Sequence, residues 1–164
     1  MRLNLHDTIG IPGTRKTFSY SPDFSGLSFA SVREIGTPSV SGEVRNEAGA
    51  LTLTAVLTVD LSCVCARCLK EFTKHVSLPI TAFLATEVQN EDKTDIFLLD
   101  GDNVDLNEIV NTAFVLNMDQ KFLCSETCKG LCPKCGKNLN DGPCGCRPET
   151  DPRLAVLGQF LENE

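Results

Sequence analysis

Six cysteines crowd into the stretch from Leu123 to Cys146, and their spacing constrains this chain more than any other feature. They follow the pattern C-x3-C-x3-C-x2-C-x8-C-x-C, which is too dense for cysteines that serve only as small core residues. Within it, Cys132-Pro133-Lys134-Cys135-Gly136 predicts a tight turn, because proline presets φ and glycine tolerates the conformation that follows. Such a turn leaves backbone N–H groups pointing at sulfur and is typical of a zinc knuckle.

The nine cysteines divide into four local pairs and one left over. Structural zinc takes four ligands in a tetrahedron, so four pairs predict two Zn²⁺ ions. The most economical grouping puts the last four cysteines in one site, and lets the C-x-x-C turn at residues 65–68 share the other with two cysteines from downstream. Crossed pairings stay open. Cys63 is the ninth cysteine, taken as buried or a spare thiol, and whether it is a ligand also stays open. The predicted metal ligands are Cys65, Cys68, Cys124, Cys128, Cys132, Cys135, Cys144 and Cys146.

Disulfides and a thioredoxin-like redox pair are the alternative uses of such cysteines. Polar residues interrupt Met1–Gly10, which does not resemble an apolar signal segment, so we expect a cytoplasmic protein. Closely spaced cysteines in that compartment more often bind metal than form disulfides. No βαβ pattern surrounds either C-x-x-C turn, which argues against a redox pair. No apolar run approaches about 18 residues, so no membrane partner is expected.

The formal net charge of −7 opposes broad binding to phosphate. Eight thiolates holding two zinc ions would bring it to about −11. Between Lys121 and Arg153, however, lysines and arginines outnumber carboxylates. These cations either neutralise thiolates or contact a partner. The predicted partner-binding residues are Lys129, Lys134, Lys137 and Arg147.

Hydrophobic periodicity predicts an α+β protein: residues 1–120 form an antiparallel β-rich domain, and residues 121–164 a cysteine-rich zinc-binding module. Residues 40–45 and 51–61 alternate in polarity around a turn at residues 46–49, which predicts a β-hairpin. A further strand is expected over 72–83, with shorter ones near 2–5, 17–20 and 95–99. Asp105 and Glu108 form a capping box that predicts a helix over 105–117, packed on the sheet. A second, short helix is expected from Asp151, with Pro152 at its first position.

Three segments together resemble one known family: residues 65–69 (CARCL), the block from Leu123 to Cys146, and residues 151–157 (DPRLAVL). They are similar to the bacterial YceD-like proteins, known as large ribosomal RNA subunit accumulation proteins. The resemblance implies a non-enzymatic cytoplasmic protein linked to accumulation of 23S ribosomal RNA. Some relatives have fewer cysteines, so the resemblance implies that the second zinc site is a subgroup feature.

Two functions follow as hypotheses. The first is a binding module for the pre-ribosomal large subunit, acting on ribosomal RNA or on a ribosomal protein. The second is a thiol-based redox or zinc-responsive regulator. Closed four-sulfur sites leave no position for a zinc-bound water, and the chain carries no phosphate loop or nucleophile motif. We therefore expect no enzymatic activity and no small-molecule substrate.

Overall fold

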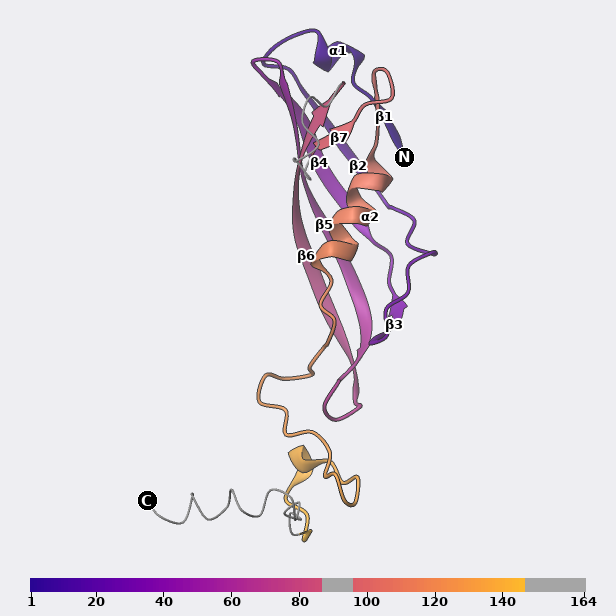
Figure 1. The fold of residues 1–164 in the computed structure, drawn as a ribbon, viewed down its shortest axis with the longest axis vertical. Coiled ribbons are helices and arrows are strands. Elements are labelled where there is room, and N and C mark those ends of the chain that lie inside the picture. The colour runs from indigo at the N-terminus through magenta and orange to yellow at the C-terminus, as the bar shows by residue number, and fades with distance from the viewer. Residues whose placement is uncertain (87–95, 147–164) are drawn as a thin grey trace, which may run out of the picture.

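The computed structural model describes residues 1–86 and 96–146, and its main element is a sheet built on two long strands. β5 (Ala50–Val64) and β6 (Glu71–Ala85) pair over their whole length as an antiparallel hairpin. β4 (Ser39–Glu47) pairs with β5, and β2 (Arg15–Tyr20) pairs with β4 (Figure 1). The hairpin is the longest feature of the molecule, and the cysteine-rich segment lies at its far end.

Four shorter strands complete the described fold. β3 (Val32–Ile35) pairs with the end of β5 that β4 does not cover. β7 (Ile96–Leu98) adds to β6 in parallel, over only three residue pairs. β1 (Arg2–Asn4) and β8 (Asn103–Asp105) form a separate two-stranded sheet, and α1 (His6–Ile9) follows β1. Together with one longer helix, these elements make the α+β fold that the sequence predicts.

The alternating pattern of β5 fixes which face of the sheet is buried. Its odd-numbered residues, from Leu51 to Cys63, are all buried, as predicted. α2 (Leu106–Asn117) lies on this face, and its Phe114 stacks on Phe24 with ring centroids 4.5 Å apart. Asp105 caps the helix by accepting a hydrogen bond from the backbone N–H of Asn107, which agrees with the predicted start of this helix.

The turn that joins β4 to β5 is shorter than predicted. Ala48 and Gly49 alone form it, and both have positive φ, at 54° and 94°, as a two-residue hairpin turn requires. Asn46 belongs to β4 and is 1% exposed. Its Nδ2 donates to the carbonyl oxygens of Thr8 and Ile9, at 2.8 and 3.0 Å. The asparagine that looked like a turn residue therefore anchors α1 to the sheet.

Cys63 lies in the hydrophobic core and is fully buried, and burial raises the pKa of its thiol. Two predicted features, the helix from Asp151 and the partner-binding residue Arg147, lie outside the described residues. Within the described part of the chain, none of the helices has the length and apolar character that crossing a membrane requires.

Candidate metal centres

The two C-x-x-C turns share one backbone structure. In the first, Leu69 N donates to the carbonyl of Cys65 at 3.0 Å, and Cys65 N donates to that of Lys70 at 2.9 Å. In the second, the corresponding bonds from residues 136 and 132 measure 2.9 and 2.8 Å. The residue after the second cysteine has positive φ in both, 59° at Leu69 and 72° at Gly136. The glycine was expected there; a leucine in that conformation was not.

The first sulfur of each turn is surrounded by backbone N–H groups. Burial raises the pKa of Cys65, but N–H groups of Cys124 and of two residues in its own turn outweigh burial and lower the pKa to about 6. N–H groups of the corresponding two residues in the second turn lower the pKa of Cys132 to about 6. Both turns therefore stabilise a thiolate, the form in which cysteine binds metal.

The pKa values of two other thiols shift in the opposite direction. A hydrogen bond with a neighbouring thiol, together with burial, raises the pKa of Cys124 to about 12, and the same two causes raise that of Cys146 to about 12. Thiols this close cannot all ionise unless a cation neutralises them, because each thiolate disfavours the next.

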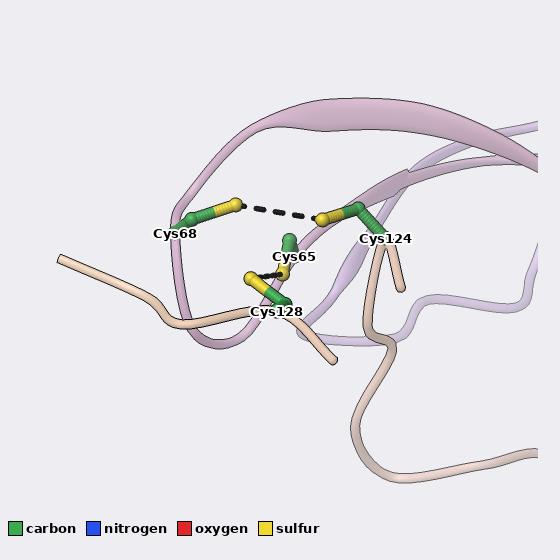
Figure 2. A group of neighbouring side chains, drawn as sticks. All are labelled: Cys65, Cys68, Cys124 and Cys128. Atoms are coloured by element: carbon green, nitrogen blue, oxygen red, sulfur yellow. Dashed lines mark hydrogen bonds between the residues drawn. The ribbon is translucent and has the colours of Figure 1, made fainter. Parts of the chain in front are cut away.

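The first turn meets two cysteines from far along the chain (Figure 2). Cys65 Sγ lies 3.8 Å from Cys128 Sγ, and Cys68 Sγ lies 3.6 Å from Cys124 Sγ. All four sulfurs lie within 4.8 Å of one another. Three of the four side chains are buried, and Cys124 is half-buried. We call this group (Cys65, Cys68, Cys124, Cys128) the inner cluster.

Arg67 holds the downstream segment against the first turn with both its backbone and its side chain. Its carbonyl accepts a hydrogen bond from Leu131 N at 3.2 Å, and its Nη1 donates to the carbonyls of Glu126 and Cys128 at 3.3 and 2.9 Å. Gly130 passes so close that a Cβ on it would lie 3.0 Å from the Arg67 carbonyl oxygen. This role of Arg67 leaves no signal in the sequence, because the partners of its side chain are backbone carbonyls about 60 residues away.

The second group forms within a single short segment. The sulfurs of Cys132, Cys135, Cys144 and Cys146 lie within 4.8 Å of one another, and we call this group the outer cluster. Cys132 is buried, Cys144 and Cys146 are half-buried, and Cys135 is exposed. Lys137 Nζ donates to the Pro143 carbonyl at 3.0 Å, which closes the loop between the two pairs.

Asn140 connects the two clusters, a role that the sequence analysis also missed. It lies in the short 3-10 helix η1 (Leu139–Asp141), between the two pairs of the outer cluster. Its Nδ2 donates to Cys128 Sγ at 3.4 Å, and its Oδ1 accepts from Lys129 N at 2.8 Å. One side chain from the outer loop thus contacts a sulfur of the inner cluster.

The spacing of the sulfurs fits a tetrahedral metal ion. Zinc–sulfur bonds of about 2.3 Å place the ligand sulfurs of a tetrahedron about 3.8 Å apart. The two contacts in the inner cluster match this spacing, whereas a disulfide would need about 2.0 Å. All nine cysteines are free thiols. The two groups of four could therefore hold metal ions, and they are the same groups that the sequence suggested; metal binding itself stays a prediction.

Three of the predicted partner-binding residues lie beside these clusters. Lys129, Lys134 and Lys137 are all exposed, and all lie on the segment that carries the outer cluster. The structure thus places three cations on one segment, but does not test what they bind.

Fold and clusters define an α+β protein with two four-cysteine groups at one end of a long β-hairpin. A model of one family, the large ribosomal RNA subunit accumulation protein YceD, matches residues 52–161, more than half of the chain. The chain belongs to this family.

The chain is also similar to individual proteins, one of which carries the family's name. Uncharacterized proteins of Mycobacterium bovis and Mycobacterium tuberculosis are each 25% identical over 164 residues, covering 98% of this chain and 74% of their own length. A chloroplastic YCED homolog 1 of Arabidopsis thaliana, also named as a large ribosomal RNA subunit accumulation protein, is 35% identical over 60 residues, 36% of this chain and 19% of its own. No solved structure matches the chain.

Proposed function

We propose that this protein is a non-enzymatic, cytoplasmic zinc protein that supports accumulation of the large-subunit ribosomal RNA, with one Zn²⁺ in each cysteine cluster. The observation that carries the metal assignment is the convergence of four thiols within 4.8 Å of one another in each cluster, with two sulfur pairs of the inner cluster at the spacing that tetrahedral zinc needs. Membership of the YceD family supports the link to ribosomal RNA.

Four sulfurs complete the coordination of a structural zinc ion, so neither ion would carry a reactive water. The role of the metal would be to fold the downstream segment and to fasten it to the hairpin. The protein would then act by binding, with ribosomal RNA or a ribosomal protein of the pre-ribosomal large subunit as its partner.

The metal assignment is tested by elemental analysis of protein purified under reducing conditions without added metal. We expect two zinc ions per chain, and one after either cluster is disrupted. Folded protein that contains iron instead of zinc, or that contains no metal, would contradict the assignment. The cellular role is tested by deleting the gene and measuring the ratio of 23S to 16S ribosomal RNA, which should fall and should recover with the intact gene.

The exposed lysines of the outer segment are the proposed contacts to the partner. Reversing charge at Lys134 and Lys137 together should weaken co-sedimentation with large-subunit precursors while the zinc content stays at two. Reversal at Arg15 and Lys16, on the distant strand β2, is the matched control. Association that survives reversal of Lys134 and Lys137 would contradict this account of the outer lysines.

One observation supports a second function, a thiol-based or zinc-responsive regulator. Cys135 is exposed, and it is the only one of the eight clustered cysteines in that class. Peroxide could take two electrons from Cys135 and a neighbouring thiolate, form a disulfide and release the metal. Rapid and reversible zinc loss at low peroxide, with no binding to ribosomal particles, would favour this function over the first.

A further inference from the structure

Among the described residues, nothing pairs with the outer edge of strand β6 along most of its length. β5 pairs with all of β6 on one side, but β7 covers only residues Phe83–Ala85 on the other. The register between β5 and β6 contains no bulge, so backbone groups alternate regularly between the two sides. Leu99 N donates to the Ala85 carbonyl at 2.9 Å on the β7 side. The odd-numbered residues of β6 therefore direct their N–H and C=O groups away from β5.

The outward groups below β7 have no partner in residues 1–86 and 96–146. No hydrogen bond reaches the backbone N–H or C=O of Thr73, His75 or Ser77 on this side. Pro79 shares their parity, and a residue without an N–H fits a free edge better than a paired one. A row of unpaired groups at two-residue spacing is a template for a further strand.

Two hollows lie along this edge, and α2 forms the far wall of both. One, of about 270 Å³, lies between residues 74–78 of β6 and Phe114, Met118 and Phe122. The other, of about 170 Å³, lies between residues 79–82 and Ala113 and Leu116. The hollows are about four residues apart along the strand, roughly 13 Å. An added strand would place two side chains of one face, four residues apart, in the two hollows while its backbone pairs with β6.

Charge around the edge favours a basic occupant. Lys74 Nζ already contacts Asp119 at 3.0 Å, and the His75 ring contacts Asp60 at 2.7 Å. Glu71 and the adjacent Lys70 are both exposed at the start of the same strand and offset each other, so the net charge of −7 over the whole chain decides the sign. The outward carbonyl oxygens and this net negative charge disfavour phosphate, whereas a lysine-rich peptide would complement them.

We propose that the edge of β6 and the groove beside α2 bind an extended, basic protein segment, with apolar residues at alternate positions, by strand addition. The groove uses none of the clustered cysteines. The inference deepens the proposed function by naming the class of partner, and it rests on that function only for the source of the segment, a protein of the pre-ribosomal particle.

The test uses the zinc-loaded full chain, labelled with ¹⁵N, and a capped peptide of about eight alternating lysines and valines as the probe. In the free protein, the amides of Thr73, His75 and Ser77 should exchange fast, while those of Lys74 and Val76 exchange slowly because they bond to β5. Peptide should protect the odd-numbered amides and leave the even-numbered ones unchanged. Odd-numbered amides that are slow in the free protein, or that the peptide leaves unprotected, would overturn the proposal.

Two variants and a modified probe separate strand addition from plain charge attraction. Ser77→Pro removes one outward N–H, and Leu116→Lys puts a cation on the rim of the smaller hollow, where the leucine is 78% exposed. Each substitution should weaken the affinity for the peptide by about tenfold or more. Val56→Lys, on the opposite face of the sheet, should change affinity less than twofold and serves as the control.

The modified probe is the same peptide with every second backbone amide methylated, which keeps the charge and removes the donors. It should bind at least about tenfold more weakly. Equal binding of both peptides would overturn the proposal, and so would protection of the same amides by a single-stranded RNA oligonucleotide in place of the peptide. Zinc content and the 23S RNA ratio are measured on the same variants. A normal 23S RNA ratio in variants that lose peptide binding would reject only the link between the groove and the proposed function, and a failed zinc measurement with intact peptide binding would reject only the metal assignment.

Discussion

The inner and outer clusters are built on the same C-x-x-C turn, but they join different parts of the molecule. The inner cluster brings together cysteines that are separated by 56 and 63 positions in the sequence, and it is mostly buried. The outer cluster closes a segment from Cys132 to Cys146 and includes an exposed thiol. Closing the longer loop costs only about 1 kcal/mol more. The two clusters should therefore differ in their contribution to stability mainly through burial and through the contacts that each one holds in place, and less through loop length.

This comparison gives the largest expected effect to loss of the inner cluster. Cys65→Ser and Cys132→Ser change the same position of the same turn, and each should remove one zinc ion. Cys65→Ser should lower the melting temperature by about 10 °C, because it also frees the downstream segment from the hairpin. Cys132→Ser should lower it by less than half as much, as calorimetry of the two purified variants can show. Equal losses would mean that the two clusters are equally important for folding.

Metal removal should separate the clusters by rate. With excess chelator at neutral pH, zinc should leave in two phases of equal amplitude, the faster at least about tenfold quicker. The faster phase belongs to the outer cluster, because solvent and chelator reach Cys135 directly. A colorimetric zinc indicator in stopped flow follows both phases, and Cys132→Ser should abolish the fast one alone. A single phase, or loss of the slow phase in that variant, would break the proposed order.

Much of this arrangement could be predicted from sequence because it rests on local spacing. The turn at Cys132 has proline and glycine at informative positions, and the alternation of β5 identifies its buried face. The roles of Asn140 and Arg67 were missed because each side chain contacts a segment that only the fold brings close. Asn140 donates to a sulfur, and Arg67 donates to backbone carbonyls. Asn46 misled for a related reason: asparagine is common in turns and was placed in the turn predicted over residues 46–49, and only the fold shows that it is buried against α1.

A pair of glycines tests how tightly the downstream segment docks on the first turn. Gly130 and Gly136 have nearly equal φ, 75° and 72°, so alanine is strained at both by about 1 kcal/mol or more. A Cβ at Gly130 also meets the Arg67 carbonyl, whereas none of the described atoms outside the adjacent residues lies within 4 Å of one at Gly136. Gly130→Ala should destabilise by about 2–3 kcal/mol and Gly136→Ala by about 1 kcal/mol, as measured by urea unfolding.

The matched glycine variants also report on metal. Gly130→Ala should speed zinc loss from the inner cluster in the chelator assay, because it lifts the segment that carries Cys128. Gly136→Ala should leave that phase unchanged. If the two variants are equally stable, the close approach of Gly130 to Arg67 is not tight in solution.

The smallest expected effect concerns the one position at which the two turns differ in strain. Leu69 has φ of 59° and a side chain 64% exposed, at the place where the second turn has Gly136. A leucine in this conformation costs about 1–2 kcal/mol, and glycine there would lose about 0.5–1 kcal/mol through the greater freedom of the unfolded chain. Leu69→Gly should therefore stabilise the zinc-loaded protein by about 0.5 kcal/mol. Destabilisation by this substitution would show that the exposed leucine makes a stabilising contact that the outer turn lacks, and the two turns would then be alike only in backbone.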